Sequence, residues 1–242
     1  MTMTCLVVGA SGATGRLLVA ELLARGHRVR VLLRAPGRLP QALREAPGLS
    51  LVGSSALDLS AADLARQVEG CDAVASCIGH TMSWRGMFGP PRRLVTETTR
   101  RLCEAIAALR PARPVRFVLM CSAGVRNQDL SEPISWGQHS LLALLRLLLP
   151  PHADNEQAAE QLRRRVGAQA QGIEWAVLRP DALVDSEQPT PYTLHPSPTR
   201  SALFDSGRSS RINVAHCMAE LLCEEPTWQR WKGRMPVLYD EA

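Results

Sequence analysis

Three glycines spaced three residues apart stand near the start of the chain, between an apolar segment that ends at Val8 and a stretch with helical periodicity. Glycine permits a tight turn, a close approach of backbone to ligand, and close contact between helix and strand. The unpaired N–H groups at the start of such a helix attract phosphate. The pattern therefore predicts a diphosphate site for a dinucleotide, the alternative being a degenerate turn that no longer binds one. Its residues would be Gly9, Ser11, Gly12, Ala13, Thr14 and Gly15.

Two arginines indicate which dinucleotide fits. The second apolar segment, residues 28–33, is followed by Arg34 and then by Arg38, with no acid between them. A carboxylate at this place would bind ribose hydroxyls and repel a 2′-phosphate, whereas a guanidinium attracts the phosphate. We therefore expect NADP(H) to be preferred over NAD(H). The alternative is that both arginines are ordinary surface residues.

The elements that must position these residues alternate between strands and helices. Several strand candidates are apolar throughout, as is typical of parallel strands covered on both faces. The alternation predicts an α/β fold with a doubly wound parallel Rossmann sheet and a binding crevice at the carboxyl ends of its strands. The expected strands are 4–8, 28–33, 49–53, 73–78, 115–121 and 173–178, and the expected helices are 13–25, 61–68, 91–109 and 153–170.

Single residues predict where helices begin and end. Gly26 should end the first helix, Asp58 or Ser60 should cap the helix that begins at 61, and Pro91 should lie in the first turn of the next. Residues 185–198 contain four prolines and should be irregular, before a helix near 213–223 and a strand near 235–239. We expect a single domain over residues 1–242, in which 185–242 partly cover the substrate.

Composition excludes several classes of protein. The 242 residues are 45% hydrophobic and 21% charged, which indicates a globular chain. The net charge of +5 comes from arginines spread along the chain and not interleaved with aromatics, so no nucleic-acid site is expected. The histidines and cysteines lack metal-ligand spacing, so no metal is expected. The seven cysteines, without a Cys-x-x-Cys, should be buried thiols in a reducing compartment.

The longest apolar run, Leu141 to Leu149, contains Arg146 and ends before two prolines, so it is too short to span a membrane. We expect it to pack against the body or in a homodimer interface, or to bind a protein partner. A lid over an apolar substrate and a segment that touches a membrane are the alternatives. No cationic leader precedes the first strand, so a cytoplasmic protein is expected.

Together the motifs resemble the atypical short-chain dehydrogenase/reductases. The resemblance is closest to the NAD(P)H-binding branch that contains NmrA-like proteins and biliverdin reductase B, also called flavin reductase, and it covers most of the chain. The motifs that carry it are residues 9–15, Arg34, Asp58-Leu59, Cys121-Ser122-Ala123-Gly124 and Leu178-Arg179-Pro180. The resemblance implies an NAD(P)H-dependent oxidoreductase acting on a small-molecule substrate.

The resemblance also implies a course for the cofactor across the sheet. The adenine would lie beside Asp58 and Leu59. The middle of the cofactor would pass Ile78, which ends the fourth expected strand, and then Gly79 and His80. The nicotinamide end would lie near Cys121, Ser122, Pro180 and Ala182.

The resemblance fails at the catalytic pair. Typical members use Tyr-x-x-x-Lys, in which lysine lowers the tyrosine pKa and the phenol protonates the carbonyl oxygen. Here the matching positions are His152 and Glu156, the only lysine is Lys232, and neither Tyr192 nor Tyr239 has a lysine four residues on.

Three hypotheses remain. Hydride goes to a flavin-, quinone- or enone-like acceptor that takes its proton from water, so that orienting two rings is the main contribution. Alternatively His152 donates the proton, its pKa set by Asp154, Glu156 or an arginine. In the third, the chain binds NADPH without turnover and regulates a protein partner. Ser122 is a second catalytic candidate, because its hydroxyl could bind the substrate carbonyl; otherwise it satisfies local backbone.

Overall fold

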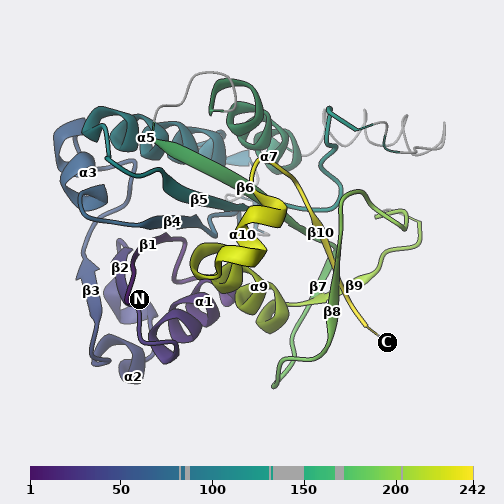
Figure 1. Ribbon diagram of the computed structural model, residues 1–242, viewed down its shortest axis with the longest axis horizontal. Coiled ribbons are helices and arrows are strands. Elements are labelled where there is room, and N and C mark those ends of the chain that lie inside the picture. The colour runs from purple at the N-terminus through teal and green to yellow at the C-terminus, as the bar shows by residue number, and fades with distance from the viewer. Residues whose placement is uncertain are drawn as a thin grey trace.

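Eight strands form one mostly parallel sheet in the computed structural model, which describes residues 1–81, 83, 84, 88–130, 132, 150–166, 172–202 and 204–241 (Figure 1). The strand order is β3-β2-β1-β4-β5-β6-β10-β8, and β8 is antiparallel to β10. This confirms the predicted Rossmann fold. The strands are β1 (Thr4–Val8), β2 (Arg28–Leu32), β3 (Leu49–Val52), β4 (Ala73–Ser76), β5 (Val115–Met120), β6 (Ile173–Pro180), β8 (Tyr192–His195) and β10 (Val237–Asp240). A separate parallel pair consists of β7 (Ala182–Val184) and β9 (Arg208–Ser210).

Helices cover both faces of the sheet, and each face has its own buried apolar cluster (Figure 1). On one face lie α1 (Ala13–Ala24), α9 (Arg211–Cys223) and α10 (Glu225–Trp231). On the other lie α3 (Ala61–Val68), α5 (Leu94–Leu109) and α7 (Pro150–Gln161), which continues as a π-helical turn over Leu162–Val166. A 3₁₀ turn over Pro36–Arg38 and the short α2 (Gln41–Arg44) follow β2.

Two of the predicted helix boundaries are confirmed. Gly26 has a φ of +77° and follows the last turn of α1, a conformation that glycine adopts without strain. Ser60 caps α3, since its hydroxyl accepts a hydrogen bond of 3.1 Å from the Asp63 N–H. Asp58, the other candidate, instead accepts a hydrogen bond from the Ser55 hydroxyl at 2.6 Å.

Two expectations about local structure are wrong. Pro91 lies outside α5, which begins at Leu94, because the first N–H groups of that helix bind a carboxylate from another element. Residues 185–198 are not wholly irregular, because they contain β8, which pairs with β10 between two prolines of the segment. In both cases a tertiary contact overrides the local signal.

A buried arginine joins the carboxyl end of β6 to the segments around it. Arg179 is 0% exposed, and its guanidinium pairs with the Glu132 carboxylate at 2.8 Å. It also donates to the backbone carbonyls of Met235 at 2.7 Å, Val125 at 2.8 Å and Pro196 at 3.2 Å. The other Glu132 oxygen accepts from the Asn127 N–H at 2.9 Å. This cluster fixes the chain that follows β5.

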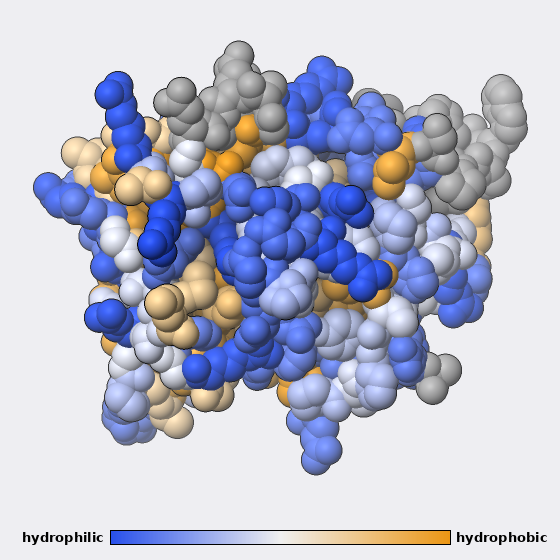
Figure 2. Space-filling model, viewed as in Figure 1, coloured by the Kyte–Doolittle hydropathy of each residue, from blue (hydrophilic) through white to orange (hydrophobic). Residues whose placement is uncertain are grey.

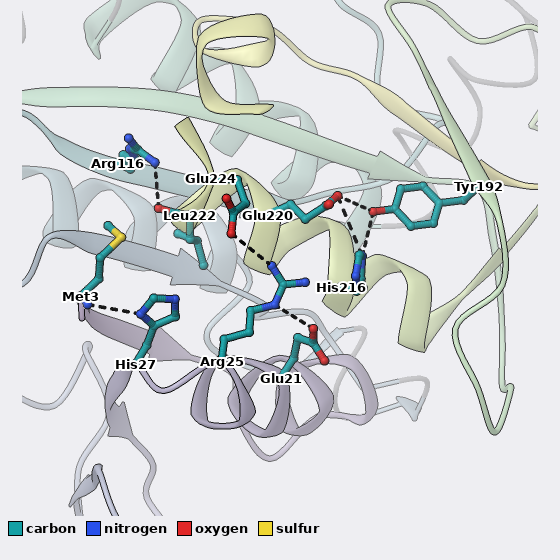
Figure 3. A network of polar contacts seen from close by, with 10 residues as sticks. All are labelled: Met3, Glu21, Arg25, His27, Arg116, Tyr192, His216, Glu220, Leu222 and Glu224. Atoms are coloured by element: carbon teal, nitrogen blue, oxygen red, sulfur yellow. Dashed lines mark hydrogen bonds and ion pairs between the residues drawn. The ribbon is translucent and has the colours of Figure 1, made fainter. Parts of the chain in front are cut away.

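Polar contacts join α1 and β8 to α9 (Figure 3). Arg25 at the end of α1 bonds Glu21 at 2.8 Å and lies 4.0 Å from Glu224, which follows α9. The Tyr192 hydroxyl donates to Glu220 at 2.6 Å and lies 2.9 Å from His216 Nδ1, which fastens β8 to α9. The pKa of Tyr192 is raised, chiefly by burial, so its hydroxyl stays protonated.

His27 in the same region gives stability a pH dependence. Its Nδ1 accepts a hydrogen bond from the Met3 N–H at 3.2 Å, which requires neutral imidazole, and burial followed by the Arg25 charge lowers its pKa below 6.5 (Figure 3). A lowered folded-state pKa means that the unfolded chain binds the proton first, so the contribution of His27 to stability is complete above pH 6.5 and is lost on acidification.

We expect His27→Gln to reduce the amount by which the urea midpoint falls between pH 7.5 and pH 5.5. An unchanged slope would contradict this assignment.

Polar and charged side chains cover most of the face shown in Figure 2, with smaller apolar areas between them. As expected, the cysteines are free thiols; six are buried and Cys223 is half-buried. Among the helices that the structure describes, none is long and apolar enough to cross a membrane. The 141–149 segment lies outside the described residues, as does the rest of 133–149.

Candidate functional site

The glycine turn joins β1 to α1 and lies against the end of β4. Gly9 has a φ of +80°, and a Cβ there would lie 2.5 Å from the carbonyl carbon of Cys77. A Cβ on Gly15 would lie 2.2 Å from the Gly9 oxygen. Both distances are far below van der Waals contact, so side chains at these positions would force the turn and its neighbours apart. The tight turn at Gly9 and the close helix contact at Gly15 are thus confirmed. Ligand approach at Gly12 stays a prediction.

The start of α1 presents its backbone without a side-chain cap. Gly12 is the N-cap, with extended backbone, and no side chain accepts the N–H groups of the first turn, which contains no acid. Four N–H groups at a helix start lack partners within the helix, and the helix dipole adds partial positive charge there. The first turn, which includes Ala13 and Thr14, can therefore bind an anion such as a diphosphate.

A pocket of about 380 Å³ opens beside this turn, at the carboxyl ends of β1 and β2. Ser11, Leu33, Arg34, Ala35 and Arg38 line it. Both arginines are exposed, and neither forms an ion pair with any residue that the structure describes. The pocket thus combines an apolar wall with two uncompensated positive charges. These residues fit the adenosine end of a dinucleotide with a phosphate on its ribose.

The segment after β4 is held by a buried hydrogen bond between His80 and Asp154. His80 Nε2 lies 2.8 Å from Asp154 Oδ2, with only 4% of the histidine and 1% of the aspartate side chain exposed. Asp154 also accepts hydrogen bonds from the Val95 N–H at 2.7 Å and the Thr96 N–H at 2.9 Å, at the start of α5. One carboxylate therefore joins the segment after β4, α5 and α7. In the chain, Ile78 and Gly79 lie between Cys77, which contacts Gly9, and His80, which bonds Asp154.

The role of Asp154 in setting the pKa of His152 stays a prediction. Asp154 is buried on α7 and bonds His80 and the N–H groups at the start of α5. His152 lies 3.6 Å from Glu156, one turn further along α7. That glutamate was another of the alternatives given above.

Ser122 and His152 come together at the carboxyl end of β5. The Ser122 hydroxyl accepts a hydrogen bond from the Gly124 N–H at 3.3 Å. A Cβ on Gly124 would lie 3.5 Å from His152 Cε1, so the imidazole packs against this turn. Cys121 beside them is buried, and burial raises its pKa to about 12, which keeps it a thiol and excludes a thiolate nucleophile at neutral pH.

The remaining candidates lie on the same edge of the sheet. Asp58 and Leu59 follow β3, where Arg101 donates to the Leu59 carbonyl. Pro180 ends β6 and accepts a hydrogen bond at 2.9 Å from the Ala123 N–H, while Ala182 begins β7 and is exposed. All the predicted site residues thus lie at or beyond the carboxyl ends of strands. Their contacts with a cofactor stay predictions.

Sequence reasoning missed two buried pairs and one arginine near this edge. It did not pair Asp154 with His80 or Arg179 with Glu132, and it did not single out Arg126 on the turn after β5. The available signal for Asp154 was an acid four residues before Ala158 on the buried face of α7.

Comparisons with known proteins identify the family. A family model described as NAD(P)H-binding matches residues 9–225. Dihydroflavonol 4-reductase of Zea mays is 31% identical over 133 residues, which cover 52% of this chain and 36% of that protein. The chain spans between 22% and 36% of the length of the curated relatives it matches.

Solved structures share the fold over nearly the whole chain. A short-chain dehydrogenase/reductase of Veillonella parvula in complex with NADP is 17% identical, with a TM-score of 0.71, and the match covers 100% of this chain and 96% of that one. A candidate NADH-flavin reductase of Streptococcus pneumoniae is 17% identical, with a TM-score of 0.67 and coverage of 99% and 100%.

Proposed function

Because the chain belongs to the NAD(P)H-binding family, we propose that it is an NADPH-dependent reductase that transfers hydride to a flavin-, quinone- or enone-like small molecule without a Tyr–Lys pair. The observation that carries the proposal is the pocket formed by Ser11, Arg34 and Arg38 beside the uncapped start of α1. It supplies two guanidinium groups for a 2′-phosphate and backbone N–H groups for a diphosphate.

The residues of the chain have separate tasks in this proposal. The turn from Gly9 to Gly15 binds the diphosphate, and Arg34 with Arg38 selects the phosphorylated adenosine. The His80–Asp154 pair fixes the segment along which the middle of the cofactor passes. When bound, the reduced nicotinamide supplies the hydride, and Ser122 is placed to orient the ring or its acceptor. Acceptors of this class collect their proton from water, so orientation supplies most of the rate enhancement.

The similarity to a candidate NADH-flavin reductase supports reduction of a planar, conjugated acceptor. The test is NADPH oxidation, followed by absorbance, with a panel of flavins, quinones and enones, beside calorimetric titration of NADPH. We expect binding and turnover with at least one acceptor class. Binding without turnover would leave a nucleotide-binding protein without this activity, and no heat with NADPH or NADH would overturn the proposal altogether.

The role of His152 is tested separately. We expect His152→Ala to leave flavin or quinone reduction within about twofold of the wild type, because water supplies the proton to these acceptors. His27→Gln is the matched control, since His27 lies between α1 and β2, at the amino end of that strand and away from the candidate site. Turnover that collapses in His152→Ala but not in the control, at unchanged NADPH affinity, would assign proton donation to His152.

A further inference from the structure

Arg126 differs from every other arginine that the structure describes. Each of the other described arginines that has no polar or ring partner is exposed to solvent. Arg126 also has no such partner, but it is half-buried. Its Nε is buried without a hydrogen-bond acceptor. A buried donor without an acceptor is costly, and a guanidinium is among the side chains least tolerated in that state. The side chain therefore has unsatisfied capacity for an anion.

The two acidic residues that follow Arg126 most closely in the chain pair with other groups. Glu132 pairs with Arg179 through one oxygen and with the Asn127 N–H through the other. Asp129 pairs with Arg163. The side chains outside the described residues include no aspartate or glutamate. Among the described residues none accepts a hydrogen bond from Arg126 Nε, so an anion from outside the chain can be its acceptor.

The backbone on both sides of Arg126 is held rigidly. The Val125 carbonyl accepts from Arg179 at 2.8 Å, and its N–H donates to the Ser122 carbonyl at 2.9 Å. The Asn127 N–H on the other side donates to Glu132 at 2.9 Å. A guanidinium on a fixed backbone loses less conformational entropy when it binds, which favours affinity. The Arg179–Glu132 pair thus prepares Arg126 to bind an anion.

The position of Arg126 indicates which molecule carries the anion. It follows Ser122 by four residues, in the turn that leaves the carboxyl end of β5. The arginines in the pocket for the cofactor's phosphates, Arg34 and Arg38, instead follow β2, three strands away in the sheet order. The β5 end is the one at which Ser122 and His152 meet, and in the proposed function it faces the acceptor.

We propose that Arg126 binds an oxyanion, a carboxylate or phosphate, on the hydride acceptor and thereby determines substrate specificity. The inference rests on the proposed function in placing the acceptor at the end of β5. The planar guanidinium binds such groups through two parallel hydrogen bonds, which selects acceptors that carry an anionic substituent over neutral ones with the same ring.

The test compares FMN with riboflavin, which share the ring system and differ by one phosphate. Dissociation constants are measured by calorimetry with and without saturating NADP⁺, conditions in which no hydride can be transferred. We expect the wild type to bind FMN at least about tenfold more tightly than riboflavin, the size of one charge-assisted contact. Arg126→Met should lose this preference and keep riboflavin affinity, and Arg126→Lys should keep part of it.

Arg113→Met is the control, because Arg113 is exposed just before β5 and should not change the preference. A preference that survives in Arg126→Met, or is absent from the wild type, would overturn the proposal for Arg126. A loss of NADP⁺ affinity in Arg126→Met would assign the side chain to the cofactor and would also overturn it. Absence of NADP⁺ binding by the wild type would instead defeat the proposed function, so the two failures are distinguishable.

Discussion

Arg34→Ala should weaken NADPH binding by about tenfold to a hundredfold while changing NADH binding little. Arg34 lines the pocket beside the glycine turn and has no ion pair among the described residues, so its charge is available to a ligand. One charge-assisted contact to a phosphate is worth about 1.5–3 kcal/mol, and each 1.4 kcal/mol is about tenfold in affinity. NADH lacks the 2′-phosphate and should not use this contact.

Calorimetric titration of both coenzymes measures the effect. Arg44→Ala is the matched control, since Arg44 is also exposed, in the nearby α2, but does not line the pocket. The contribution of Arg34 to NADPH affinity should become smaller at high salt, because salt screens the charge of an exposed guanidinium. Equal losses for NADPH and NADH in Arg34→Ala would show that Arg34 does not contact the 2′-phosphate.

Arg179→Met should destabilise the fold by about 3–5 kcal/mol, because it leaves the Glu132 carboxylate buried beside an apolar side chain. Three backbone carbonyls also lose their donor, those of Val125, Pro196 and Met235. Urea unfolding followed by tryptophan fluorescence measures the loss, since Trp175, Trp228 and Trp231 are buried.

Two further variants keep this prediction testable if Arg179→Met does not fold. Glu132→Gln removes the charge and keeps an oxygen acceptor, so it should lower the free energy of unfolding less than Arg179→Met does. Because the two side chains contact each other, the variant with both substitutions should lose less stability than the two single losses added together. Asp205→Asn is the control, because it breaks an exposed pair with Arg200 and should cost below about 1 kcal/mol. A loss of similar size in Asp205→Asn and Arg179→Met would refute the special role of the buried pair.

Much of the sheet could be predicted from the sequence because parallel strands covered on both faces are apolar along their whole length. The predicted first strand matches β1, and the next five lie within two residues of the observed ones. The short strands could not be predicted. β7, β8 and β9 have three or four residues each, and they form by pairing with partners more than 20 residues away in the chain.

In the candidate site, too, features carried by a short segment could be predicted and features that depend on distant residues could not. The glycine turn and Arg34 were predictable because a short local segment carries the whole signal. The His80–Asp154 pair was not, since its members are 74 residues apart. Arg126 was hidden for another reason: its distinctive property is the lack of a partner, and that depends on where the neighbouring acids are bound.

β10 lies between β6 and β8 in the sheet, although residues 192–195 of β8 are synthesised long before 237–240 of β10. During translation, β1 to β6 can pair as they emerge, whereas β8 must wait for a partner made some 40 residues later. The nucleotide-binding half of the molecule is thus able to assemble first. A nascent chain halted before β10 should already recognise the coenzyme, with its acceptor side still open.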